Sequence, residues 1–522
     1  MAISAALFRD AATMQTGVWF CFVGWSAKRG AVCVPTVIAL DARFLATSLK
    51  PMSFCIRGLV LTWLALVPAG LYATELTDQQ SGWLHAAERH ERSGWIYLHI
   101  EGSPRERGFQ HGYLLAPEIA EGLRIARADW VHQSSLDWSW LVSNTKSFVE
   151  SGIDSEDRAE LKGIVEGLRA AGVNETYDDL VTYNAQIELE WYWWPIARQK
   201  LSGMDFVKQP RESCSSFIAT GQMTRDGGIV LGHNTMSDYV EALFNVVIDI
   251  QPASGHRILM QTQPGWIHSG TDFFITDAGL VGSETTIGDF QHFTEKGIPE
   301  FIRMRRATQD ADGIDQWCSI MKKGNNGGYA NAWLLGDVNS GEIARLELGL
   351  KYIGFERTTN GYYTGSNIAE DPHLLRLETT TKDTDIRDTS VARRVRWKQL
   401  MKQYAGQIDV AVGEKMEGDD FDVRLNQEHP GGRTIAGHPE LESQLTAPTS
   451  EIPFAPWGTA DAKVVDSTMA KNMSFAARWG SADGMAFDAD AFLTAHPQFD
   501  WLTGYLKSRP AEPWVEFKAG EK

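Results

Sequence analysis

The sequence contains few cysteines and an excess of negative charge. Only five of its 522 residues are Cys, a number too small for a disulfide-rich scaffold. It carries 49 Lys and Arg against 67 Asp and Glu, for a net charge of −18. This balance argues against general nucleic-acid binding, which needs clustered positive charge. With 43% hydrophobic and 22% charged residues, the composition also excludes a disordered chain, a collagen-like repeat and a coiled coil.

Several familiar catalytic signatures are missing. The sequence has no Gly-x-Ser-x-Gly elbow, no His-Glu-x-x-His, no phosphate-binding Gly-x-x-x-x-Gly-Lys-Ser/Thr and no Cys-x-x-Cys. These absences disfavour α/β-hydrolases, zincins, P-loop proteins and zinc ribbons. No short motif signals a metal, although a site assembled from distant residues is not excluded. We therefore expect neither a metal nor another cofactor.

Residues 52–73 have the pattern of a secretory signal peptide. Arg57 precedes a short apolar run and small residues that end at Ala73, as in such peptides. The run is short for a membrane span and polar sequence follows at once, although a single membrane anchor is the alternative. We expect translation to start at Met52 and residues 1–51 to be an over-extended N-terminus. The predicted location is periplasmic or secreted, or a lysosome-like compartment in a eukaryote.

Cleavage after Ala73 would leave Cys214 and Cys318 as the cysteines of the mature chain. A disulfide between them is one possibility, and a cysteine kept for chemistry is the other. Cys318 lies beside Trp317 and close to Met321 on a predicted helix, and we expect it to be a small buried hydrophobic residue.

Residues 74–213 are predicted to be mainly helical. Their clearest helix spans 155–171, with Ser155 as the N-cap and Gly172 as the stop. A further helix is expected from 177 to 190.

From residue 214 onward, short apolar runs separated by turns predict consecutive β-hairpins, with helices returning near 390–404 and 489–506. Helices combined with antiparallel sheet indicate an α+β fold. We expect 214–522 to be a core fragment and 74–522 to form one globular domain.

Cys214 stands at the junction between the helical and the hairpin-rich parts. A small buried residue is the ordinary interpretation of such a cysteine. The strand that returns toward it carries His233, Asn234 and Thr235, which could activate a thiol or bond to their own backbone. Simple pairing about the intervening turn would bring Asp238, rather than His233, close to Cys214.

An ordered set of short blocks resembles the phospholipase B-like family of the N-terminal nucleophile (Ntn) hydrolases, which are related to penicillin acyltransferase-like self-processing enzymes. Any single block is weak, but their common order is a strong signal. The blocks are Gly102-Ser-Pro-x-x-Arg-Gly-x-x-His-Gly112, Cys214-Ser215, His233-Asn-Thr235, Leu280 to Gly288 with its Glu-Thr-Thr-Ile, Tyr329-Ala-Asn331-Ala-Trp333, and Gly458-Thr-Ala-Asp461-Ala-Lys463-Val464. Met236 and Ala330 depart from residues common in the family, which leaves the shape of the acyl pocket open.

The resemblance implies an αββα sandwich of stacked antiparallel sheets flanked by helices. It also implies that a precursor cuts itself between Ser213 and Cys214. Cys214 would then be both the nucleophile and, through its new α-amine, the base, since an α-amine titrates near pH ~8.

Further roles follow from the same resemblance. Asn331 is the first candidate for binding the oxyanion, and donors within His233 to Thr235 are the second. Thr285 and Thr286 would orient the amine or the substrate. Asp461 and Lys463 are expected to form a buried structural pair.

Nineteen Trp residues suggest an aromatic interior or cleft. Trp191 and Trp194 could line an acyl pocket, although packing in the core is at least as reasonable.

Three functions remain open at this point. The leading hypothesis is an exported, self-processing acyl hydrolase that cleaves an amide or a carboxylic ester through a thioester on Cys214. The alternatives are an acyltransferase with an amine acceptor and a non-catalytic, lipid-binding envelope protein. The expected partners are an acylated small molecule or lipid and the two fragments of one precursor, with no nucleic acid and no stable membrane span after processing.

Overall fold

The computed structural model describes residues 75–203, 214–242, 244–270, 273–290, 292–443, 445 and 452–521. The predicted over-extended N-terminus (1–51), the predicted signal peptide (52–73) and Ser213 lie outside these residues. All the described residues belong to one compact unit, Leu71–Lys522.

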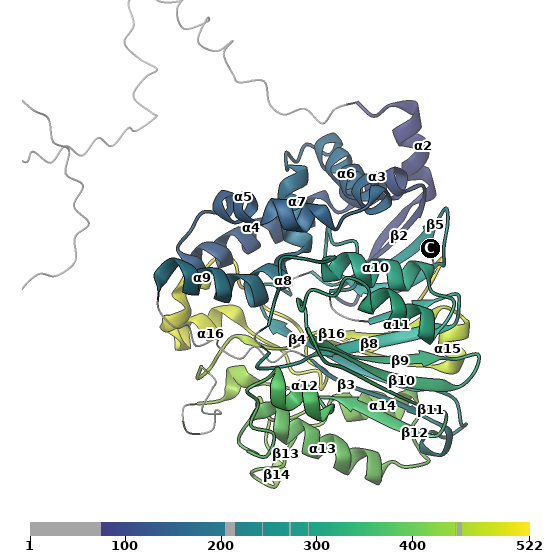
Figure 1. The fold of residues 1–522 in the computed structure, drawn as a ribbon, viewed down its shortest axis with the longest axis vertical. Helices are drawn as coiled ribbons and strands as arrows, with labels where there is room; N and C mark the ends of the chain where they lie inside the picture. Colours follow the sequence, from purple (N-terminus) through teal and green to yellow (C-terminus); the bar gives the residue numbers. More distant parts are fainter. Residues whose placement is uncertain are drawn as a thin grey trace, which may run out of the picture. The chain divides into compact units, whose positions relative to one another are not determined.

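Two stacked sheets form the centre of this unit (Figure 1). The larger sheet contains, in spatial order, β1 (Glu88–Arg92), β2 (Trp95–Gly102), β5 (Val246–Pro252), β6 (Ile258–Thr262), β7 (Phe273–Thr276), β8 (Leu280–Thr286), β9 (Asn331–Asp337), β10 (Glu342–Leu348) and β11 (Ile353–Thr358). The smaller contains β12 (Gly361–Gly365), β3 (Ser215–Thr220), β4 (Val230–Asp238), β15 (Trp457–Asp466), β16 (Ser474–Trp479) and β17 (Val515–Lys518). Neighbouring strands are antiparallel except β2 and β5, which are parallel. A separate ribbon pairs β13 (Phe421–Asp422) with β14 (Gln427–Glu428).

Helices cover the outer faces of both sheets. The N-terminal part supplies α2 (Asp78–Ala86), α3 (Pro104–Leu114), α4 (Ala116–Ser134), α5 (Trp138–Ser151), α6 (Ser155–Ala170), α7 (Tyr177–Asn184), α8 (Gln186–Glu188), the π-helix η1 (Leu189–Trp193) and α9 (Trp194–Ser202). The rest supplies α10 (Glu300–Asp310), α11 (Ile314–Lys322), α12 (Pro372–Leu377), α13 (Thr389–Gln403), α14 (Val410–Glu417), α15 (Ser467–Lys471) and α16 (Ala489–Ala495), with 3₁₀ turns η2 (Gly221–Met223), η3 (Pro439–Leu441) and η4 (Pro497–Leu502). In Figure 1, α10 and α11 lie over the larger sheet, and α13 and α14 lie against the smaller one. The predicted αββα sandwich is confirmed.

The strands have two buried faces, which explains their mostly apolar sequences. In β2, Ile96, Leu98 and Ile100 pack in the core between the larger sheet and the helices. Trp95 and Tyr97 alternate with them and pack in the core between the two sheets. Because successive side chains of a strand point to opposite faces, one strand supports two separate cores.

The clearest predicted helix is present as α6, with a different start. Its N-cap is Asp154, whose carboxylate accepts hydrogen bonds from the backbone N–H groups of Glu156 and Asp157. Ser155 is the first helical residue instead. Both residues are good caps, so the sequence alone does not separate two adjacent candidates.

Glycines let α3 and α6 pack with their backbones in contact. A Cβ added to Gly108 would lie 2.1 Å from the carbonyl oxygen of Glu160, and one added to Gly112 would lie 2.0 Å from that of Ile164. These two glycines of the first family-like block lie four residues apart, on one face of α3. The block therefore has a packing function.

The helical part is tied to the rest by buried polar groups. The guanidinium groups of Arg107 and Arg305 both contact the carboxylate of Glu160, at 2.6 and 3.1 Å. His111 Nε2 accepts a hydrogen bond of 2.9 Å from the backbone N–H of Gly265. Together with the pairing of β2 and β5, these contacts join residues on either side of the predicted cleavage point.

The close packing of α3 against α6 can be tested with a single methyl group. We expect Gly112→Ala to lower the free energy of unfolding by about 1–3 kcal/mol, because the methyl group must push apart two helix backbones. Thermal and urea unfolding would measure the change. Gly82→Ala in α2 is the control, since its Cβ would meet no atom within 4 Å and alanine favours a helix. Equal stability of the two variants would contradict this packing.

Candidate active site

Cys214 immediately precedes β3. Its backbone φ is +82°, an uncommon conformation for a residue other than glycine. The residue is 2% exposed, and neither it nor Cys318 forms a disulfide. The possibility of a disulfide between them is therefore wrong.

Cys318 behaves as expected for an inert core residue. It is 1% exposed in the core on α11, and burial raises the pKa of its thiol to about 12. Its thiolate is therefore strongly disfavoured at neutral pH, whereas a nucleophile needs that form.

The register of the first hairpin differs from the simple expectation. Ser215 pairs with Asn234 and Ser216 pairs with His233, with no bulge between these strands. Continuing that register puts Thr235, rather than Asp238, opposite Cys214. The difference arises because the connection between the strands contains the 3₁₀ turn η2 and is longer on the β3 side than the predicted turn.

Cys214 lines a small pocket with a cavity volume of about 40 Å³. The pocket is walled by both predicted fragments, through Glu190 and Trp191 on one side and Thr235, Met236 and Tyr329 on the other. Trp191 lines this pocket. Trp194 instead packs edge-on against Trp130, with ring centroids 5.0 Å apart, and belongs to the helical core.

Arg393 is the functional candidate that sequence reasoning missed. Its fully buried guanidinium donates to the carbonyl oxygen of Cys214 at 2.6 Å and to Asn367 Oδ1 at 2.7 Å. Asn367 in turn donates to the carbonyl of Thr286 at 2.8 Å, and Thr286 is paired with Asn331 across β8 and β9. The helix that carries Arg393 was predicted. It contains several basic residues, and the sequence alone does not indicate which of them is buried.

Asn331 and Thr285 are buried polar residues that are not among those lining the Cys214 pocket. Both amide atoms of Asn331 and the hydroxyl of Thr285 lack a hydrogen-bond partner among the described residues. Such groups are rare in native interiors and call for an explanation. Thr286 is engaged, because its hydroxyl lies 2.8 Å from that of Tyr329, which also donates to Glu284.

The three consecutive candidates on β4 have separate environments. His233 Nε2 donates to the carbonyl of Glu284 at 3.0 Å. The Asn234 amide donates to the carbonyls of Glu417 and Ile435, at 2.8 and 3.0 Å, so it holds a loop. Of the three, only Thr235 lines the pocket.

Thr235 is held by a buried charged pair. Lys463 Nζ donates to the Thr235 hydroxyl at 2.6 Å and forms an ion pair with Asp461, and both charged side chains are fully buried. The expected contact between Asp461 and Lys463 is therefore present. It also positions a hydroxyl of the pocket.

The pocket is acidic on one side. Glu190 and Glu241 line it, and their carboxylates lie close to that of Asp129. None of the described residues that line the pocket is Lys, Arg or His. Where these carboxylates are ionised, they disfavour an anionic group on that side of the pocket.

His233 is expected to stay neutral at physiological pH. Burial, with the Lys463 ammonium as a second cause, holds its pKa well below the usual 6.5. The unfolded chain takes up a proton near pH 6.5 and the folded chain does not, so this residue makes stability fall as the pH drops below about 6.5, by up to ~1.4 kcal/mol per pH unit. NMR of labelled histidine rings should show no titration of His233 between pH 5 and 8, with His233→Gln identifying its signal. A His233 ring that titrates in this range would contradict the buried, neutral assignment.

Comparisons with known proteins agree with the sequence blocks. A family model described as Phospholipase B matches residues 158–350, a region that includes Cys214, Thr235 and Asn331. The chain is 31% identical to phospholipase B-like protein A of Dictyostelium discoideum over 139 residues, 24% of each chain. It is 26% identical to phospholipase B-like protein C of the same organism over 206 residues, 34% of this chain and 35% of that one.

An uncharacterized protein of Archaeoglobus fulgidus is 27% identical over 256 residues, 47% of this chain and 42% of that protein. The aligned part thus spans less than half the length of these relatives. Two solved structures of conjugated bile acid hydrolase from Clostridium perfringens, both of proteins with a single substitution, share 11% identity. They cover 51% of this chain and 89% of theirs, with TM-scores of 0.32 and 0.30. The family model and the relatives confirm that the chain resembles the phospholipase B-like family, as its sequence blocks predicted.

Proposed function

We propose that this protein is a self-processing acyl hydrolase that cleaves an amide or a carboxylic ester through a thioester on Cys214. The observation that carries the proposal is the position of this thiol residue. It is buried at the head of β3, faces a pocket, and has its carbonyl fixed by Arg393. The likeness to phospholipase B-like proteins supports the coarser part of the proposal, a hydrolase.

The backbone at Cys214 favours self-cleavage. A positive φ at a residue with a Cβ costs of order 1–3 kcal/mol, and cutting the bond before it removes the constraint. In the proposed step, Sγ attacks the carbonyl carbon of Ser213 and the C–N bond to Cys214 breaks. The nitrogen becomes an amine and takes the thiol proton. Water then opens the thioester, which releases the Ser213 carboxylate and restores the thiol.

The new α-amine would serve as the base in turnover. It accepts the thiol proton, Sγ attacks the substrate carbonyl, and the leaving amine or alcohol departs with that proton. Water hydrolyses the resulting thioester and releases a carboxylic acid. An oxyanion forms in both halves of the reaction and needs preorganised donors, each worth about 3 kcal/mol. The Asn331 amide is the first candidate, and Thr235 is the second.

Thr285, Thr286 and Trp191 complete the proposed site. The hydroxyl of Thr285 is available to orient the amine or the substrate, while Thr286 acts through Tyr329. Trp191 packs edge-on against Tyr329, with ring centroids 6.2 Å apart, and offers an apolar wall for an acyl chain.

We also propose that the protein is exported and that its two fragments stay associated after cleavage. Buried contacts cross the cut, including the pairing of β2 with β5. Within the described part of the chain, no helix combines the length and apolarity that a membrane crossing requires.

Intact-mass analysis of the purified protein tests the mechanism. We expect two fragments divided between Ser213 and Cys214, and a single inactive chain for Cys214→Ala. Cys318→Ala is the matched control, because it removes the other thiol of the mature chain and should leave cleavage and activity unchanged. A wild-type chain that stays intact yet hydrolyses its substrate would contradict the mechanism.

The acidic side of the pocket predicts a charge preference. Among p-nitrophenyl esters of matched length, we expect those with a trimethylammonium group on the acyl chain to have at least about tenfold higher kcat/KM than those with a carboxylate, a difference of ~1.4 kcal/mol. Glu190→Gln with Glu241→Gln should reduce this ratio, since both carboxylates face the pocket. Glu356→Gln, at an exposed carboxylate on β11, is the control. A ratio that is the same in all three proteins would show that these carboxylates do not select the substrate.

A further inference from the structure

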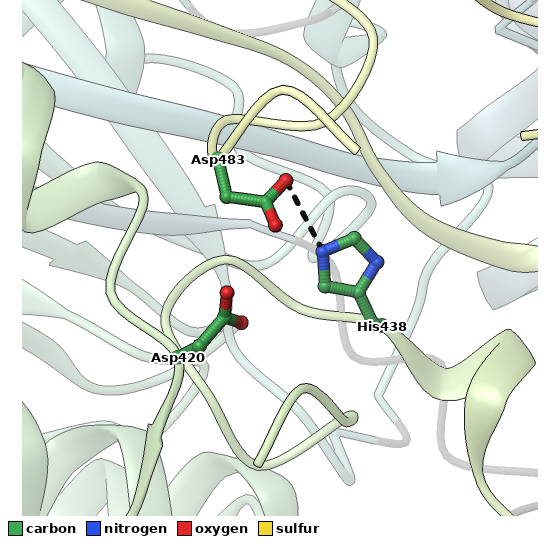
Figure 2. Close-up of side chains that lie close together, drawn as sticks. All are labelled: Asp420, His438 and Asp483. Atoms are coloured by element: carbon green, nitrogen blue, oxygen red, sulfur yellow. Dashed lines mark ion pairs between the residues drawn. The ribbon is translucent and has the colours of Figure 1, made fainter. Parts of the chain in front are cut away.

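Asp420, His438 and Asp483 form a cluster away from the residues that line the Cys214 pocket (Figure 2). They come from three separate segments: one just before β13, one just before η3 and one in the turn after β16. One side-chain ligand atom from each lies within 4.8 Å of the others. Figure 2 shows the two carboxylates and the imidazole facing a common space.

The imidazole of His438 is oriented by a fourth residue. Its side chain is 1% exposed, and Nδ1 lies 2.9 Å from Glu440 Oε1. That contact makes Nδ1 the donor and turns Nε2 toward Ser481 Oγ, 3.1 Å away, and Asp483 Oδ1, 3.5 Å away. Histidines that bind metals usually donate their other ring N–H to a carboxylate in this way, which fixes the tautomer and the ring orientation.

We propose that Asp420, His438 Nε2 and Asp483 bind a divalent transition-metal ion, with zinc the best match. One imidazole nitrogen and two carboxylate oxygens suit zinc, while water would complete four-coordination. Ligand atoms about 2.1 Å from a tetrahedral ion are about 3.4 Å apart, close to the separation of His438 Nε2 and Asp483 Oδ1. The site is independent of the proposed hydrolysis, which needs no metal.

The cluster brings two carboxylates and one imidazole within 4.8 Å of one another. A metal ion bound at Nε2 would supply two positive charges beside these carboxylates.

A metal ion at this site would stabilise a loop that packs against the pocket. Residues 417–438 are held to β4 by the Asn234 amide, which bonds the carbonyls of Glu417 and Ile435. Gly437, next to His438, packs against Met236: a Cβ there would lie 2.6 Å from Met236 Cε. Met236 lines the pocket. An ion bound at His438 would therefore stabilise the loop that packs against Met236.

Zinc binding by the full-length purified protein tests the proposal. After dialysis against a chelator, titration calorimetry and elemental mass spectrometry should find one zinc per chain, with a higher thermal midpoint. His438→Gln and Asp420→Asn should each weaken binding at least about 100-fold, and Glu440→Gln about 10–100-fold. His256→Gln is the matched control, because His256 also lies between two carboxylates, those of Asp277 and Asp312, but on the surface.

Other results would overturn the site. Wild-type protein that binds no zinc beyond the level of His438→Gln would do so. Binding of calcium or magnesium that survives His438→Gln would remove the imidazole from the site. If His438→Gln fails to fold, ring NMR of wild-type protein decides: zinc must remove the Nε2 proton of His438, and a retained proton refutes the ligand. None of these readouts depends on Cys214 or on enzymatic activity.

Discussion

The hydrogen bond from Arg393 to the carbonyl of Cys214 connects the parts of this molecule on which the candidate site depends. It fixes the chain at the head of β3, where the backbone has an unfavourable positive φ. The same guanidinium holds Asn367, which holds Thr286. A fully buried cation is costly unless its donors are used, so this arrangement forces α13, both sheets and the thiol into one geometry. Without it, Cys214 would lie at a free strand end.

Much of the fold could be predicted from periodicity and turns. Apolar runs between turn residues predicted the hairpins, and the helix expected at 155–171 is present as α6, with its cap and its end each one residue earlier. The register of β3 with β4 could not be predicted in the same way. It depends on which residues of the connection belong to the loop that contains η2 and which belong to the two strands. Turn geometry sets register, and a run of Gly, Asp and Arg is compatible with more than one geometry.

The candidate site was predictable as a set of segments rather than as a set of contacts. Cys214, Thr235 and Trp191 line the pocket. Asn234 instead forms a hydrogen bond with a loop, and Trp194 packs in the helical core. A residue's neighbours on its own strand do not reveal which side chains a distant loop will engage. Arg393 was missed for the same reason: its basic neighbours on α13 look alike in sequence, and only tertiary packing buries one of them.

The arrangement of the pocket indicates how the two pieces would stay together after the proposed self-cleavage. One wall comes from α8 and η1, ahead of the proposed cleavage point, and the other from β4 and Tyr329 behind it. Separation of the two pieces would therefore expose β5 along its parallel edge and break the buried ion pair between Arg305 and Glu160. Removing one partner from such a buried pair costs about 3–5 kcal/mol. The same contacts that bury the thiol would thus hold the walls of its pocket together, and the proposed cleavage would change the chemistry of Cys214 without dismantling the fold around it.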